Sequence, residues 1–270
     1  MKILLDNGIF IHSEFAEDAI NPTTVNWGDT TITRSVHGLV RKKPDDDPEY
    51  QSQKEALFTV GTLIREGRIQ AYDYIEIRFE RMRGRAPIQH FNALQNCQIH
   101  RCLTPVERFR FRQTINIMET IAKGGKNDRK AGTALGIANQ IPFFEWLCRL
   151  SKPNVDNIVK HAADIGLPPF EVESLKNVEW FQVVCRRSGS PENYPDVFHL
   201  WTAERNGLDA VLTLEKRLPN LVFRINNERN KKIQIRTEVL RPLQLLRKLG
   251  INETDPVPMA PDRFYDYLTL

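Results

Sequence analysis

Short apolar runs and helical patterns alternate along the first hundred residues. The run KILL at residues 2–5 predicts a buried strand, and Asp6 places a carboxylate at its carboxyl end. Apolar positions spaced three and four apart predict a helix over 51–67, which ends at a glycine. A second strand is predicted at 68–75 and the next helix at 75–85. The order strand, helix, strand, helix favours an α/β fold.

One segment departs from this alternation. Residues 24–41 alternate apolar and polar positions around a Trp-Gly-Asp turn signal at 27–29, which predicts a β-hairpin. The segment 42–51 that follows is charged and marked by prolines, so we expect a loop. Its three aspartates are more typical of a solvated loop than of a metal site.

The middle of the chain changes from alternating elements to helices. Thr104 and Glu107 form a capping box with a proline at the first helical position, which predicts a helix start. Further helical patterns follow up to residue 175. We therefore expect a helical, partly basic insertion at 100–175, between two parts of a core at 1–99 and 176–270.

Strand patterns return in the last third of the chain. The apolar run at 209–214 predicts a strand, and Glu215 follows it directly. Two further short strands are predicted at 217–223 and 231–237. A helix at 241–250 is expected to close the fold.

Composition narrows the class of protein. Hydrophobic residues make up 41% and charged residues 27% of 270 positions, which is typical of a folded domain. No apolar run reaches the roughly 18–20 residues that span a bilayer, and Asp6 interrupts any signal-like start, so no membrane partner is expected. The four cysteines lack paired spacing, which favours reduced thiols and a cytoplasmic location. Cys97, His100 and Cys102 lie close together, but no fourth zinc ligand is placed near them.

Carboxylates recur where the predicted elements begin or end. Asp6 and Glu215 each follow a strand, and Asp196 lies at the head of a short helix. Glu80 lies in the helix after the second strand. Because the carboxyl ends of parallel strands share one edge of a sheet, these side chains are expected to gather there and to raise one another's pKa values. Hard divalent cations such as Mg²⁺ take oxygen ligands of this kind.

Several of these residues have structural alternatives. Glu76 lies one helical turn before Glu80 and is an alternative second acid. Asp6 and Asp196 are also suited to capping helices without any chemical role. His199 suits a phosphate-orienting role or a structural one, and Thr213 suits a bond to a ligand water or polar core packing.

Four segments together resemble the PIN-domain nucleases: KILLDNGIFI at 2–11, EGRIQAYDYIEIRFERMRGR at 66–85, DVFHLWTAERNGLDAVLTLEKRL at 196–218 and RTEVLRPLQLLRKLG at 236–250. The resemblance covers about 150 residues by these motifs and the elements around them. It implies a three-layer α/β/α sandwich around a mainly parallel sheet. It also implies Mg²⁺- or Mn²⁺-dependent phosphodiester hydrolysis, most typically by an endoribonuclease. The catalytic and metal-binding residues it implies are Asp6, Glu80, Asp196 and Glu215.

The chain departs from the family pattern in three places. Asn7-Gly8 follows the first acid where a Thr-Asn pair is more usual, and the last acid is Glu215 where Asp is more common. The hairpin and the insertion at 100–175 are absent from a minimal member. These departures leave open a second reading, a non-catalytic module that binds nucleic acid or protein. The resemblance also raises two partners that the sequence does not reveal, an inhibitory protein and a second copy of the chain.

Basic residues cluster around Glu80 and in the first part of the predicted insertion. Residues 99–130 hold eight Lys and Arg against three Asp and Glu, within a chain of net charge +4. RFRFR at 108–112 interleaves arginine with phenylalanine, as stacking surfaces for single strands do, although a solvated helix face gives the same pattern. The expected partner is RNA or another single-stranded nucleic acid. The residues predicted to contact it are Arg78, Arg81, Arg83, Arg108, Arg110, Arg112, Lys126, Arg129 and Lys130.

Overall fold

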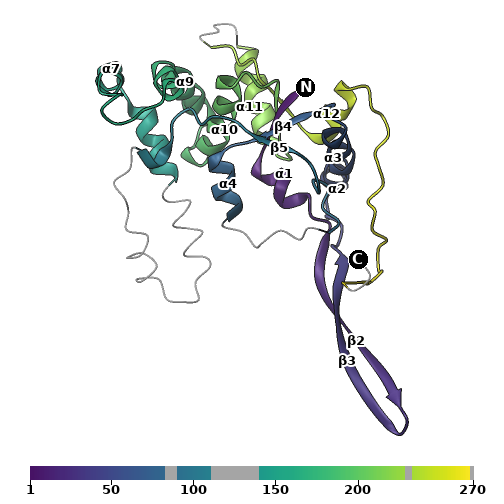
Figure 1. The fold of residues 1–270 in the computed structure, drawn as a ribbon. Helices are drawn as coiled ribbons and strands as arrows, with labels where there is room; N and C mark the ends of the chain where they lie inside the picture. Colours follow the sequence, from purple (N-terminus) through teal and green to yellow (C-terminus); the bar gives the residue numbers. More distant parts are fainter. Residues whose placement is uncertain (83–89, 111–139, 229–232, 268–270) are drawn as a thin grey trace.

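The computed structural model describes residues 1–82, 90–110, 140–228 and 233–267. Helices flank a five-stranded sheet on both sides, and a long two-stranded ribbon projects from this body (Figure 1). The predicted α/β fold, a three-layer α/β/α sandwich, is confirmed. No helix within the described residues has the length and apolar character needed to cross a membrane.

The sheet is parallel throughout and has the order β5-β4-β1-β6-β7. The first strand lies at its centre, where Ile3 pairs with Ala71 on one side and with Ala210 on the other. Ile3, Leu4 and Leu5 are fully buried, as a continuous apolar run in a sheet covered on both faces should be. The strands are β1 (Lys2–Leu5), β4 (Gln70–Asp73), β5 (Ile99–Arg101), β6 (Ala210–Leu212) and β7 (Glu238–Leu240).

Two groups of helices cover the sheet. One group contains α10, which contacts β1 and β6 and packs against α9, while α11 contacts α9 and β7. The other group contains α2, α3 and α12, which pack on one another beyond the opposite face (Figure 1). The helices are α1 (Asn7–His12), α2 (Pro48–Glu55), α3 (Leu57–Arg65), α4 (Ile75–Met82), an unlabelled helix at 140–149, α7 (Lys152–Lys160), α8 (Pro169–Lys176), α9 (Val178–Ser188), α10 (Tyr194–Arg205), α11 (Arg217–Asn226) and α12 (Pro242–Lys248), with 3₁₀ turns η1 (Arg108–Arg110) and η2 (Pro191–Asn193).

The predicted hairpin is confirmed and is longer than expected. Strands β2 (Ala16–Trp27) and β3 (Thr30–Arg41) pair in one unbroken register, from Ala16 opposite Arg41 to Trp27 opposite Thr30. Gly28 takes φ +60° at the first of the two turn positions. The type I′ and II′ turns of two-residue hairpins require a positive φ there, which glycine adopts without strain. A short strand, β8 (Tyr265–Asp266), pairs with β3 near the base of the ribbon.

Much of the predicted insertion belongs to the core. The strand β5 crosses the expected boundary at residue 100 and forms an edge of the main sheet. Phe144, from the helix at 140–149, lies 4.8 Å from the ring of Phe198 in α10. Phe181 in α9 stacks on Trp201 in α10 at 5.1 Å. These four aromatic side chains are buried, and Phe143, Phe144, Leu147 and Leu175 bring the second half of the predicted insertion into the same hydrophobic core.

Three sequence-based element predictions are wrong. Residues 217–223 lie in helix α11, because Leu218, Leu221, Val222 and Ile225 repeat at helical spacing and are all buried. Within 231–237 the described residues 233–237 form no strand, and the pairing strand is β7 just after them. The segment from Thr104 begins with a loop and the turn η1, whereas the rest of the expected helix, from 111 on, lies outside the described residues.

The predicted helix at 51–67 is divided in two. Ala56 ends α2 and begins α3, where Leu57, Phe58 and Val60 are buried. Gly61 in α3 packs directly against the backbone of Ala93. A Cβ added at Gly61 would lie 1.9 Å from the carbonyl oxygen of Ala93. Only glycine permits this contact, which joins α3 to the segment after α4.

Candidate functional site

The four predicted acids converge at the carboxyl edge of the sheet. The pKa of Asp196 is raised to about 7, mainly by burial and in smaller part by the negative charges of Asp6, Glu215 and Glu80, while His199 lowers it. Asp6 follows β1, Glu215 follows β6, and the other two acids lie on α4 and α10. The tertiary structure therefore gathers carboxylates from four separate segments around Asp196.

Thr213 joins two of these acids. Its hydroxyl donates a hydrogen bond of 2.9 Å to Oδ2 of Asp6 and accepts one of 3.1 Å from the backbone N–H of Glu215. Thr213 is buried, and its own N–H donates to the carbonyl of Leu240 in β7. The side chain therefore fixes the Asp6 carboxylate relative to the end of β6, a contact that was not among the roles considered from the sequence.

His199 lies between two of the acids. Its Nε2 is 3.9 Å from Oδ1 of Asp6 and 3.8 Å from Oε1 of Glu80, while its Nδ1 lies 2.6 Å from the hydroxyl of Tyr74. The side-chain amide of Gln140 donates a hydrogen bond of 3.0 Å to Oε1 of Glu80. Histidine, tyrosine and glutamine therefore form a set of polar groups that orients these carboxylates.

The structure distinguishes Glu80 from Glu76. The side chain of Glu76 is 1% exposed and pairs with the guanidinium of Arg108 at 3.0 Å, so it is a buried structural ion pair. Burial raises the pKa of Glu76, and Arg108 opposes that rise. Glu80 instead contacts Gln140 and faces His199. Of the two alternatives, Glu80 is the one that belongs to the acidic site.

Helix capping does not explain the two aspartates. Asp6 occupies the N-cap position of α1, yet its side chain makes no capping hydrogen bond there and turns to Thr213. Asp196 lies inside the first turn of α10, and the N-cap position belongs to Asn193. A carboxylate in the first turn still interacts favourably with the helix dipole. Neither residue, however, satisfies a free backbone N–H at a helix start.

Four neighbouring polar residues were not predicted from the sequence. Asp73 ends β4 at the same edge as Asp6, and its buried carboxylate accepts two bonds of 2.9 and 3.0 Å from Nε of Arg78. Tyr74 and Gln140 hold His199 and Glu80 as described above. The strand predicted at 68–75 included Asp73 and Tyr74, so the sequence did not place them at its carboxyl end. Asn7 is the fourth, because its buried Oδ1 has no hydrogen-bond partner within the described structure.

The donor types at this edge fit a hard divalent cation. Carboxylate oxygens and the unpaired amide oxygen of Asn7 are the ligands that Mg²⁺ and Mn²⁺ accept. In the described ranges, however, no three or more His, Cys, Asp or Glu side chains stand close enough to hold a metal ion together. The carboxylates instead contact protein donors, with Asp6 on Thr213 and Glu80 on Gln140.

Within the described part of the chain, Cys97, His100 and Cys102 belong to no group of three or more side chains that could hold a metal ion. The sulfur of Cys97 donates to the carbonyl of Gly61 and accepts from Arg65 at 3.6 Å. Burial raises the pKa of Cys102 to about 12, which opposes the thiolate form that zinc needs. The four cysteines are free thiols.

The basic residues predicted to contact nucleic acid divide into three groups. Arg108 is buried against Glu76, so its prediction as a surface contact is wrong. Arg78 and Arg81 pair with Asp73, and Arg110 pairs with Glu171 and Glu107, with about a third or more of each of these three arginine side chains exposed. The predicted contacts that lie outside the described residues are Arg83, Arg112, Lys126, Arg129 and Lys130.

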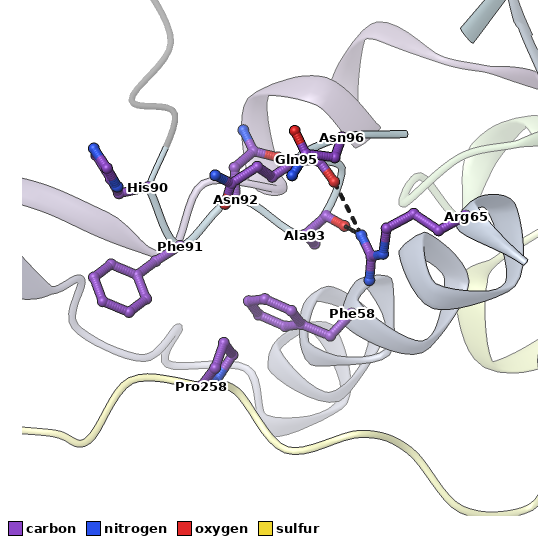
Figure 2. Close-up of a pocket in the computed structure, with 9 residues that line it drawn as sticks. All are labelled: Phe58, Arg65, His90, Phe91, Asn92, Ala93, Gln95, Asn96 and Pro258. Carbon is purple, nitrogen blue, oxygen red and sulfur yellow. Dashed lines mark hydrogen bonds between the residues drawn. The ribbon is translucent and has the colours of Figure 1, made fainter. Parts of the chain in front are cut away.

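Two pockets lie elsewhere on the protein. Figure 2 shows one of about 350 Å³ between Phe58, Phe91 and Pro258, where the guanidinium of Arg65 donates to the carbonyls of Ala93 and Gln95. The other, of about 600 Å³, lies near the amino ends of the strands, and its lining includes the first residue of the chain. Neither lining includes a carboxylate of the predicted site.

Comparisons with protein-family models, with curated proteins and with solved structures found no match. The chemistry of this site therefore rests on the chain's own residues and geometry.

Proposed function

We propose that the chain is a metal-dependent nuclease of the PIN-like type, an endoribonuclease that hydrolyses phosphodiester bonds. The observation that carries this proposal is the convergence of Asp6, Glu80 and Glu215 on Asp196, whose pKa rises to about 7. A buried carboxylate with other acids around it destabilises a folded protein unless a positive charge compensates for it. Carboxylates retained in that arrangement at a sheet's carboxyl edge are typical of a functional site.

The cation proposed for this site is Mg²⁺ or Mn²⁺. Asp6, Glu80, Asp196 and Glu215 would hold it, with the side-chain oxygen of Asn7 as a further donor. Such an ion supplies activation of water and stabilisation of the leaving oxygen in phosphodiester hydrolysis. Metal affinity should increase with pH around neutrality, because Asp196 must lose its proton before it can act as a ligand.

The surrounding residues position the acids. Thr213 holds one oxygen of Asp6 and leaves Oδ1 facing His199. Gln140 holds Oε1 of Glu80 in the same way. Groups that orient metal ligands in this manner contribute strongly to affinity and activity although they do not contact the metal.

RNA is the proposed substrate. Arg78 and Arg81 lie on α4 beside Glu80, are partly exposed, and would compensate for the negative charge that otherwise repels a phosphate backbone. A cytoplasmic location agrees with the four free cysteines. An inhibitory protein and a second copy of the chain are further partners that the family resemblance implies.

A second candidate is a non-catalytic module that keeps the fold and binds nucleic acid or protein. It is favoured by the absence, across the described segments, of any three or more acidic, histidine or cysteine groups close enough to share an ion. The two candidates differ in one respect that is easily measured, which is whether Mn²⁺ binds at the four acids.

Thermal unfolding with and without Mn²⁺ tests the proposal. At a hundredfold excess over the dissociation constant, a ligand of the folded state adds about 2.7 kcal/mol, or several degrees of Tm. We expect this rise in the wild type and its loss in Asp196→Asn. The control is Asp164→Asn, which replaces an exposed acid on the α7–α8 connection and should show the same rise as the wild type. Cleavage of single-stranded RNA should follow the same order. An equal rise in all three proteins, or none in the wild type, would reject the site.

A further inference from the structure

The ribbon formed by β2 and β3 exposes apolar side chains to solvent. Trp27 is 78% exposed, Val25 is 50% exposed and Ile32 is 48% exposed. The ribbon extends well beyond the body of the protein (Figure 1), so these side chains do not pack against the main sheet or its helices. A two-stranded ribbon on its own is only marginally stable in water, and a contact that covers its apolar side chains would stabilise it.

These side chains share one face of the ribbon. Residues directly opposite in an antiparallel pair point the same way, so the rung Val25–Ile32 shares a face with Trp27–Thr30 and with Thr23–Arg34. This surface is called the tryptophan face below. The opposite face carries the polar rungs Asn26–Thr31, Thr24–Thr33 and Pro22–Ser35, and Thr31 donates to the side chain of Asn26 across it at 3.1 Å. Ile20, 62% exposed, lies on that opposite face nearer the base.

The charge of the ribbon identifies the kind of partner. From Ile20 to Val36 the only charged residues are Asp29 and Arg34, so the outer ribbon has no net charge. A surface that binds nucleic acid needs several Lys or Arg side chains to neutralise phosphates. A surface with one acid, one base and an apolar centre is instead complementary to a second copy of itself.

The edge of β2 is unsuited to strand addition. Pro22 pairs with Ser35 across the ribbon. Proline has no backbone N–H to donate, and strands tolerate it where the missing donor faces away from the partner strand. The interruption therefore lies on the free outer edge of β2, where it hinders edge-to-edge pairing with another chain. Association through the tryptophan face is the mode of contact that this interruption does not hinder.

We propose that the tryptophan face is a docking surface for the same face of a second copy of this chain. In this arrangement a two-fold axis runs perpendicular to the strands, along the direction of the Val25–Ile32 rung. The Val25–Ile32 rung of one chain then stacks on the same rung of the other chain. The Trp27–Thr30 rung of each chain then lies over the Thr23–Arg34 rung of the other. Within these rungs Trp27 lies over Thr23 of the other chain and diagonally across from its Arg34, and tryptophan is the best aromatic partner for an arginine side chain. This inference is independent of the proposed nuclease activity.

The contact is small, so its strength should depend on concentration. An interface of three rungs from each chain is small beside a standard complex, and we expect dissociation constants on the order of micromolar. Sedimentation equilibrium of the full chain, of mass 31.3 kDa, should show the mean mass rising towards twice that value between ~1 and ~100 μM. A mass that stays at the monomer value overturns the proposal.

Two single variants test which face associates. Trp27→Ala should weaken association at least tenfold, because it removes the largest exposed side chain of the tryptophan face. Thr24→Ala is the matched control, on the polar face of the same strand. It should associate like the wild type. Equal loss in both variants, or loss in neither, overturns the proposal.

A charge-rescue pair separates docking from misfolding of the ribbon. Val25→Lys and Val25→Glu should each be monomeric, because the two-fold axis places like charges at the same rung. An equimolar mixture of the two should restore association, which a damaged ribbon could not do. If the mixture does not associate, the proposed arrangement is overturned. If the face binds a different protein and not a second copy, the wild type alone stays monomeric.

Discussion

The hydroxyl of Tyr74 lies 2.6 Å from Nδ1 of His199. Burial raises the pKa of Tyr74 well above its usual value, so the phenol stays protonated and donates a hydrogen bond to Nδ1. The neutral ring then carries its own proton on Nε2, which faces Asp6 and Glu80 at 3.9 and 3.8 Å. A residue at the end of β4 thereby sets the tautomer of a histidine on α10, and the histidine presents an N–H to two carboxylates.

Removal of the phenol hydroxyl should therefore affect both stability and the acidic site. We expect Tyr74→Phe to lower the free energy of unfolding by about 1–3 kcal/mol, because it leaves Nδ1 of the buried His199 unpaired. It should also weaken Mn²⁺ binding about tenfold or more. Urea unfolding and metal titration measure the two effects. Tyr72→Phe is the control, because its hydroxyl makes one exposed bond of 3.4 Å, and it should change stability by less than ~0.5 kcal/mol.

The raised pKa of Asp196 predicts how stability depends on pH without metal. The folded pKa of about 7 exceeds the usual 3.8, so the folded state binds the extra proton between these values. Stability should therefore decrease as pH rises from about 4 to about 7, by no more than about 4 kcal/mol from this group. Asp196→Asn should remove that decrease and be the more stable protein at pH 8. Urea unfolding in the presence of a chelator at pH 5 and pH 8 measures this decrease in both proteins. The same change in the free energy of unfolding between the two pH values in wild type and Asp196→Asn would contradict the assignment.

The ion pair between Arg108 and Glu76 should matter for folding rather than for nucleic acid binding. Both side chains are buried, so Arg108→Ala leaves an unpaired carboxylate and should destabilise the protein by about 3–5 kcal/mol. Replacing both partners, with Glu76→Leu and Arg108→Met, should cost much less. Chemical denaturation of the two variants tests this. If the single variant unfolds like the wild type but loses RNA binding, Arg108 is a surface contact after all.

The close approach at Gly61 should tolerate no side chain. Gly61→Ala sets a Cβ 1.9 Å from the carbonyl oxygen of Ala93, and the backbone must move to relieve it. We expect a loss of about 1–3 kcal/mol in the free energy of unfolding. Gly8→Ala in α1 is the contrasting variant, because the nearest atom there is 3.5 Å away, and it should be neutral or stabilising by about 0.5–1 kcal/mol. A Gly61 variant as stable as the wild type would show that α3 can separate from Ala93.

The sequence alone determined the local elements whose pattern is complete within a few residues. The apolar runs of β1 and β6, with Asp6 and Glu215 after them, could be found because a strand buried on both faces is continuously apolar. The hairpin around Gly28 was predicted because alternation and turn chemistry agree over one short segment. Where two patterns compete, as in 217–226, a short apolar segment fits a strand or a helix, and the helix was missed.

Only the tertiary structure decided which polar residues lie together at the candidate site. Glu76 and Glu80 are one turn apart on the same helix, and the choice between them depends on Arg108, 32 residues from Glu76. Thr213 became part of the site because its hydroxyl meets Asp6, 207 residues away. Burial, pairing and pKa depend on contacts between distant parts of the chain, and these contacts are absent from any local pattern.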